Sequence, residues 1–396
     1  MVNQISDDQP SHNTAPWLSL AFRPFFIGAG LFSVIAITLW MLIYSFGMQI
    51  RIQHIPLTYW HAHEMIFGYG LAVIAGFLLT AVINWTGVKT VTGIPLLLMF
   101  LLWGAARLMP FIEDRSALYL MASFDSLFCL FFAWSFARSV FISKQWKQLG
   151  ILSKILLLLA SNIIFYLGVT GVLPDGMRWG IYLGLYLIIA LILMMGRRVI
   201  PFFIEMATGQ EEVKNSKLLD ISSLILFLFF MFSDILAPSA LVTAMLALAL
   251  TILHSLRLYM WYTISVWTKP LLWVLFVAYM FITAGFALKT AGYFVDIPGF
   301  ISLHAFAFGG IGIMTIGMMA RVSLGHTGRD VSNPPKGLSL VFLLITAGAI
   351  VRVFLPMITA SQYYMTWIAL AQFLWIASFS IFLYLCLPIL VRQEVS

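Results

Sequence analysis

Long apolar runs separated by short polar connections make up almost the whole of this 396-residue chain. An apolar run of about 20 residues is long enough to cross the hydrocarbon core of a bilayer as an α-helix. The sequence contains twelve such runs, at approximately 24–47, 61–83, 93–111, 116–140, 150–173, 178–200, 218–236, 239–260, 270–290, 299–322, 337–356 and 363–391. We therefore predict twelve membrane-spanning helices. The break at Pro238, between the seventh and eighth spans, is the least distinct.

The composition supports the same class of protein. Hydrophobic residues make up 62% of the chain and charged residues only 9%, whereas a soluble domain carries roughly 25% charged residues. We predict an all-α, polytopic integral membrane protein that forms a single transmembrane domain over residues 1–396, with a short polar tail at 1–16. The tail ends in no small-residue cleavage site, so we expect no cleavable signal peptide.

The placement of the 22 basic residues predicts the orientation in the membrane. Cytoplasmic connections of membrane proteins are rich in Lys and Arg. If both termini are cytoplasmic, 16 basic residues fall on the inner side, and six fall on the outer side: Arg51, Arg107, Arg115, Arg178, Lys289 and Arg352. We interpret the net charge of +7 as a consequence of this topology and not as affinity for nucleic acid.

The two cysteines exclude several kinds of site. Cys129 and Cys386 lie far apart in sequence, each inside an apolar run. The chain therefore has no disulfide framework, no C-x-x-C-H haem attachment motif and no cysteine-based iron–sulfur or zinc site.

Ionisable residues gather at the outer ends of the predicted spans. His61, His63 and Glu64 open the second span, His304 lies near the start of the tenth, and Asp125 lies slightly deeper in the fourth. Such residues are costly inside a membrane and are usually functional. Helical geometry points the two histidines of the second span about 200° apart, so they cannot chelate one ion but can each reach a different centre. The alternative is a belt of aromatic and histidine side chains at the membrane interface.

The tenth span combines His304 with closely spaced glycines. Gly309, Gly310, Gly312 and Gly317 would let another helix or a flat ligand approach the backbone closely. Both interpretations remain open from the sequence.

A second group of candidates lies towards the cytoplasmic ends of the spans. Arginines there either follow the positive-inside rule or pair with the propionates of a haem. The histidine within the eighth span either ligates that haem or hydrogen-bonds a neighbouring helix. The members of this inner group are Arg23, Arg197, Arg198, His254, Arg321 and His326, and the last of these lies in a glycine-flanked turn.

Four motifs resemble those of the NnrS family, polytopic membrane proteins of bacteria. The motifs are Phe22-Arg23-Pro24-Phe25-Phe26; Trp60-His61-Ala62-His63-Glu64-Met65 with Gly76-Phe77-Leu78-Leu79-Thr80-Ala81 and Asn84-Trp85-Thr86-Gly87; Gly196-Arg197-Arg198-Val199-Ile200-Pro201-Phe202-Phe203; and His304-Ala305-Phe306 through Arg321-Val322-Ser323-Leu324-Gly325-His326-Thr327-Gly328-Arg329. Two positions depart from the family pattern. Ile83 stands where a proline is expected, and Glu205 stands where a neutral polar residue is expected.

The resemblance implies haem b and copper as cofactors, a place in the bacterial inner membrane, and protection against nitric oxide. Two mechanisms follow from it. In the first, an enzyme reduces nitric oxide at a haem–metal site, with electrons from a quinol or a cytochrome and with protons delivered by Glu64 and Asp125. In the second, a transporter or sensor handles nitric-oxide-derived or metal species without catalysis. For the outer metal centres we expect His61, His63 and His304 as ligands.

Overall fold

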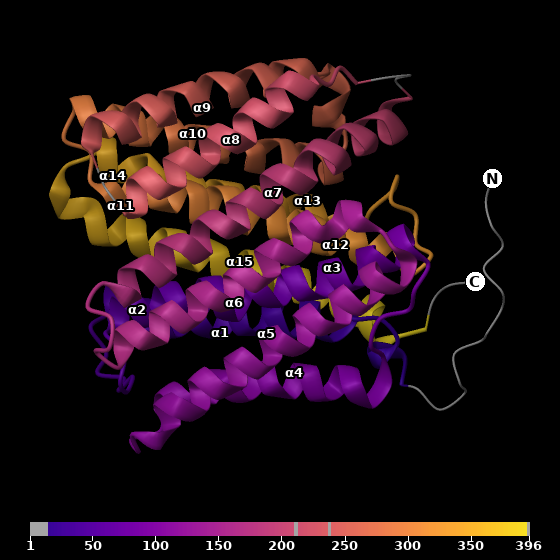
Figure 1. Ribbon diagram of the computed structural model, residues 1–396. Coiled ribbons are helices and arrows are strands. Elements are labelled where there is room, and N and C mark those ends of the chain that lie inside the picture. Colours follow the sequence, from indigo (N-terminus) through magenta and orange to yellow (C-terminus); the bar gives the residue numbers. More distant parts are fainter. Residues whose placement is uncertain (1–14, 210–212, 237–238, 394–396) are drawn as a thin grey trace.

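The computed structural model describes residues 15–209, 213–236 and 239–393, and over these residues it contains helices and connecting segments but no strand (Figure 1). The α-helices are α1 (Phe22–Trp40), α2 (Leu57–His63), α3 (Leu71–Thr86), α4 (Gly93–Leu108), α5 (Ser116–Ser143), α6 (Leu149–Val169), α7 (Gly176–Thr208), α8 (Lys217–Ile235), α9 (Ala240–Trp261), α10 (Pro270–Phe294), α11 (Gly299–His304), α12 (Ile313–Gly325), α13 (Gly337–Val353), α14 (Leu355–Ile358) and α15 (Tyr364–Val391). The predicted all-α class is confirmed. Pro238 lies outside the described residues.

The helices combine into twelve segments that are long and apolar enough to cross a membrane, which confirms the predicted number of spans. In chain order they are Phe22–Ser45, Leu57–Thr86, Gly93–Phe111, Ser116–Ser143, Trp146–Val169, Gly176–Thr208, Lys217–Ile235, Ala240–Trp261, Pro270–Phe294, Gly299–Gly325, Gly337–Ile358 and Ser361–Val391. The sixth span differs most from its prediction, because α7 continues through Pro201 and ends only where Gly209 adopts a φ of +69°. A left-handed glycine is a common helix terminator, whereas a proline inside a membrane helix is tolerated.

The start of the first span and the end of the last meet at one end of the bundle. The Arg23 guanidinium donates to the backbone carbonyl of Leu390 at 3.1 Å and also to that of Arg392. This contact fits the prediction that both termini lie on one side of the membrane. That this side is the cytoplasm remains a prediction.

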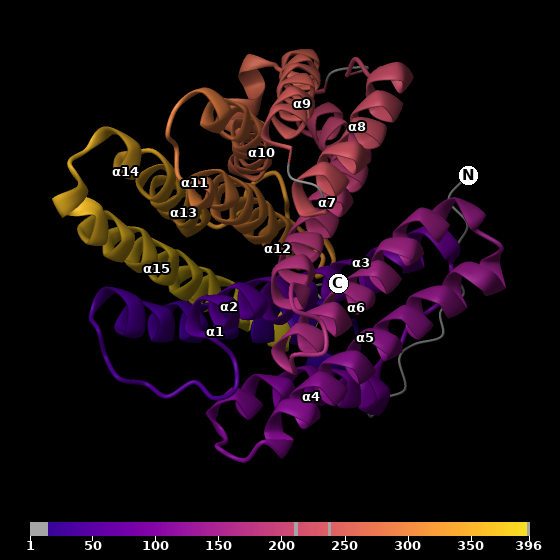
Figure 2. The same ribbon diagram turned by 60° about the vertical axis from the view of Figure 1, so that its left-hand side comes forward.

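The second, sixth and tenth spans form the centre of the bundle. Figures 1 and 2 show α8 and α9 on one side of α7 and α4 and α5 on the other. The sixth span, α7, packs against segments of both the second and the tenth. These three spans therefore bound the space in which residues from distant parts of the chain meet.

The second and tenth spans share an irregular construction. In each, a short α-helix ends at a histidine, at His63 in α2 and at His304 in α11, and a π-helix follows directly. The π-helices, η3 (Glu64–Gly70) and η7 (Ala305–Gly312), then return to α-helix in α3 and α12. π-Helical turns in proteins are rare and frequently mark functional sites. Their position directly after His63 and His304 therefore indicates a functional site at this end of the bundle.

Candidate functional site

A cavity of about 170 Å³ lies between the three central spans, near the ends that carry the histidines. His61 and His304 both line it, and the rest of its wall is mainly apolar and aromatic, including Tyr69 and Trp375. An apolar protein cavity of about 150 Å³ can bind benzene. The cavity is therefore the right size for an ion with a small molecule, but it is too small for a porphyrin ring.

Hydrogen bonding sets the tautomer of His304. Its Nδ1 donates to the carbonyl oxygen of Phe300 at 2.7 Å, which leaves Nε2 with the lone pair. The Arg352 Nη2 lies 3.2 Å from both ring nitrogens. An atom on the Nε2 lone-pair axis would be much farther from Nδ1 than from Nε2, so this contact does not occupy that axis. A carbonyl bonded to one ring nitrogen while the other faces a ligand is the usual arrangement of a metal-binding histidine.

His61 is held against the cavity by an aromatic partner. Its ring stacks on Trp40 of the first span, with ring centroids 4.6 Å apart and planes 4° from parallel. His61 and His304, separated by more than 240 positions in sequence, thus lie on one cavity wall.

His63 lies on the other side of the second span, within a fully buried network of charged side chains. Arg107 of α4 joins two carboxylates, donating to Glu64 at 2.6 Å and also to Asp125 of α5. Tyr166 of α6 donates its hydroxyl proton to the second oxygen of Asp125 at 2.6 Å. Both predicted proton-transferring carboxylates are therefore brought together, but neither lines the cavity of His61 and His304.

Both ring nitrogens of His63 face oxygen acceptors. Nδ1 lies 3.1 Å from a Glu64 carboxylate oxygen, and Nε2 lies 2.9 Å from the amide oxygen of Asn162. A neutral imidazole can donate to one of these oxygens, and only an imidazolium can donate to both. His63 and Arg107 each lie beside both carboxylates of the network. His63 has no free nitrogen for a metal in this arrangement.

A glycine makes the network sterically possible. A Cβ atom on Gly68 would lie 2.9 Å from the nearest guanidinium nitrogen of Arg107 and 2.7 Å from the Phe32 ring. The carbonyl of Gly68 accepts a hydrogen bond from the Trp103 indole at 2.9 Å. Because Gly68 has no side chain, the first π-helix leaves room beside α4 for the Arg107 guanidinium.

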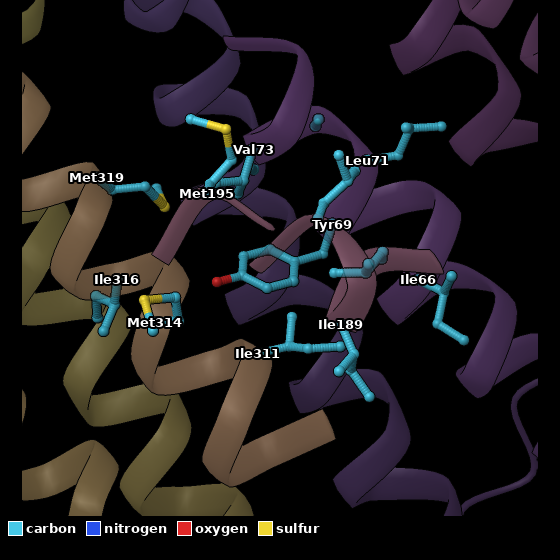
Figure 3. Packing of buried hydrophobic residues seen from close by; sticks show 14 of the residues in the cluster. Ile66, Tyr69, Leu71, Val73, Ile189, Met195, Ile311, Met314, Ile316 and Met319 are labelled. Carbon is cyan, nitrogen blue, oxygen red and sulfur yellow. The ribbon is translucent and has the colours of Figure 1, made fainter. Parts of the chain in front are cut away.

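A second, apolar cavity of about 80 Å³ lies deeper between the same three spans. The hydroxyls of Tyr69, on the wall of the outer cavity, and Thr315, on the wall of the deeper one, are 2.6 Å apart. Figure 3 shows the Tyr69 ring reaching from the second span towards Met314 of α12. This hydrogen bond is a polar link between two mainly apolar spaces.

Two of the predicted inner arginines, Arg197 and Arg321, contact protein partners. Asp220 of α8 accepts from Arg197 at 2.9 Å and from Arg257 at 2.8 Å. The guanidinium carbon of Arg321 lies 3.5 Å from the centre of the Phe203 ring, a close cation–π contact. Arg198 is exposed. Among the arginines that were candidates for pairing with propionates, Arg197 is thus already paired with a carboxylate.

His254 is completely buried between aromatic rings. It stacks on Phe286 at 5.5 Å, and its Nδ1 lies 2.7 Å from the Tyr279 hydroxyl. Arg257 donates to the same hydroxyl oxygen at 3.2 Å, so the tyrosine proton is directed to Nδ1. Nε2 then carries the ring proton and has no hydrogen-bond partner among the described residues.

Arg23 and His326 meet elsewhere, around Phe22. The guanidinium carbon of Arg23 lies 5.7 Å from the centre of that ring, and the His326 ring lies 5.9 Å from it. The structure therefore places these two members of the predicted inner group at the junction of the first and tenth spans.

Among the charged residues of the site, Arg107 and Arg352 were not singled out from the sequence. Both are among the six basic residues on the predicted outer side, and both lie within spans. The sequence contained a signal for both: each basic residue lies inside a span and on the side of the membrane that is poor in positive charge, which marks it as a functional candidate.

Comparison with known proteins gives one match. The family model described as NnrS protein matches residues 16–394, nearly the whole chain. None of the curated proteins compared with the chain matches it.

Proposed function

The chain belongs to the NnrS family, and from this premise we propose that it is a haem- and copper-binding inner-membrane protein that protects bacteria against nitric oxide. Membership fits a multi-pass membrane protein of the nitric-oxide response. The observation that carries the proposal further is that His61 and His304 line the same cavity.

The outer cavity fits copper better than it fits haem. Two imidazoles suit copper, and the hydrogen bond from His304 to the Phe300 carbonyl leaves Nε2 available for a metal. Bound copper would supply one-electron chemistry and a binding position for nitric oxide. The surrounding apolar wall would exclude water from that position, and the 170 Å³ volume admits small molecules only.

For haem, the buried imidazole of His254 remains the proposed ligand, but its ring tautomer would have to change before it could bind iron. Because Nε2 carries the ring proton in the present hydrogen-bond arrangement, binding iron there would require the proton to move to Nδ1. The ring is also tightly packed against Phe286.

In the enzymatic mechanism, two nitric oxide molecules, two electrons and two protons give one nitrous oxide and one water. A quinol or a cytochrome would supply the electrons. Glu64 and Asp125 would hold protons together with His63, since all three lie in one buried network. The network adjoins the second span on the face away from the cavity, so a proton would have to pass around that helix.

A transporter or sensor is the alternative, and one observation favours it. No group of three or more His, Cys, Asp or Glu side chains in the described part of the chain is arranged to hold a metal ion. A site with two protein ligands suits reversible binding of a metal or a gas as well as it suits catalysis.

The test is the spectrum, metal content and nitric oxide consumption of the purified protein. His61→Ala and His304→Ala should each lose copper, while His63→Ala, the matched control on the same helix, should retain it. His254→Ala should lose haem. Nitrous oxide production by the wild type would decide for the enzyme, and copper retained by both cavity variants would contradict the proposed centre.

A further inference from the structure

Arg352, near the end of α13, is a buried arginine without a counter-ion. Its side chain is only 8% exposed, and no carboxylate of the described residues forms an ion pair with it. Arg107 and Arg257 are equally buried, but each has a carboxylate partner. Burying an unpaired charge is energetically costly, so a buried guanidinium without a counter-ion indicates a partner that the protein itself does not supply.

The groups around Arg352 are neutral. Nη2 lies 3.2 Å from both nitrogens of His304, the guanidinium carbon lies 5.4 Å from the centre of the Phe300 ring, and Tyr364 is a further neighbour. Nη1 is buried and has no hydrogen-bond partner within the described ranges. The guanidinium thus keeps N–H donors for which this part of the protein offers no acceptor.

Arg352 lies between the His61–His304 cavity and a wider opening at the same end of the bundle. That opening, a vestibule of about 710 Å³, is lined by Phe300, Tyr364 and residues of two connecting segments, among them Asp296. Arg352 contacts Phe300 on the vestibule wall and His304 on the cavity wall.

We propose that Arg352 makes this end of the cavity a binding site for a small, planar, monovalent oxoanion, with nitrite as the representative ligand. The guanidinium fork matches two oxygens of such an anion, and the anion would supply the missing negative charge. The 170 Å³ cavity sets an upper limit on its size. The inference goes beyond the proposed function, because it requires neither copper nor the reduction of nitric oxide.

The experiment is calorimetric titration of the full-length protein, as purified in detergent, with sodium nitrite and with sodium chloride at constant ionic strength. We expect nitrite to bind more tightly than chloride. Arg352→Gln should weaken nitrite binding at least tenfold, and Arg352→Lys should weaken it less, because it keeps the charge and loses the fork. Arg51→Gln, a change at an exposed arginine at the same end, should leave binding unchanged.

Three results would overturn the proposal: equal binding of nitrite and chloride, equal binding by Arg352→Gln and the wild type, or naphthalenesulfonate binding as tightly as nitrite. The first and third require no variant, so the proposal stays testable even if Arg352→Gln does not fold. A chelator-treated sample separates the sites. Nitrite binding that disappears with the metal but survives Arg352→Gln would assign the anion to the metal and not to Arg352. Failure to reduce nitric oxide would leave the titration unaffected.

Discussion

Removal of the Arg107 guanidinium is the most direct test of the buried network at the second span. Arg107→Gln leaves Glu64 and Asp125, each about 1% exposed, without the cation that joins them. Breaking one buried ion pair by removing a partner costs about 3–5 kcal/mol. Since Arg107 pairs with two carboxylates, we expect a loss in the free energy of unfolding at the upper end, about 5 kcal/mol.

The assay is unfolding in mixed detergent micelles, followed by the fluorescence of the 13 tryptophans. Arg51→Gln is the matched control, because Arg51 pairs with Glu113 at 3.5 Å while both side chains are more than 70% exposed. Exposed pairs contribute little, so this variant should unfold like the wild type.

A second substitution tests whether charge balance is the cause. Adding Asp125→Asn to Arg107→Gln leaves Glu64 as the one carboxylate beside His63, and it should recover about 0.5–3 kcal/mol. If Arg107→Gln and Arg51→Gln lose the same stability, or if Asp125→Asn makes the double variant worse, the network does not stabilise the fold as argued.

Three further outcomes follow from the packing, the central hydrogen bond and the charge pattern. Gly168→Ala should destabilise the protein by about 1–3 kcal/mol, because its Cβ would lie 2.1 Å from the backbone nitrogen of Met177, whereas Gly104→Ala, with no atom within 4 Å, should not. Tyr69→Phe should lose about 1 kcal/mol in the same unfolding assay, because it removes the 2.6 Å hydrogen bond to Thr315. Reporter fusions at the C-terminus should be active on the cytoplasmic side, and activity on the outer side would reverse the predicted orientation.

The spans and the opposed histidines of the second span could be predicted because both depend on local properties. The hydropathy of about 20 consecutive residues determines whether a segment can span a bilayer, and helical geometry alone separates His61 from His63. The partners of these side chains could not be predicted. Asn162 and Trp40 come from spans whose neighbours are fixed only by packing of the whole bundle. The π-helices also escaped prediction, because the same glycines are compatible with ordinary helix packing.

The basic residues that lie inside spans on the predicted outer side could have been singled out from the sequence as candidates. There are four of them, Arg107, Arg178, Lys289 and Arg352, and the sequence identifies them as exceptions to the positive-inside rule without any structure. It does not identify their partners. Arg107 meets carboxylates from the second and fourth spans, and Lys289 meets Asp234 of α8 at 2.6 Å, so two of the exceptions are explained by charges on other helices. Arg352 has no such carboxylate among the described residues. A bound anion would neutralise a buried cation that has no carboxylate partner in the protein. Arg352 is suited to this role because it contacts His304, which lines the central cavity.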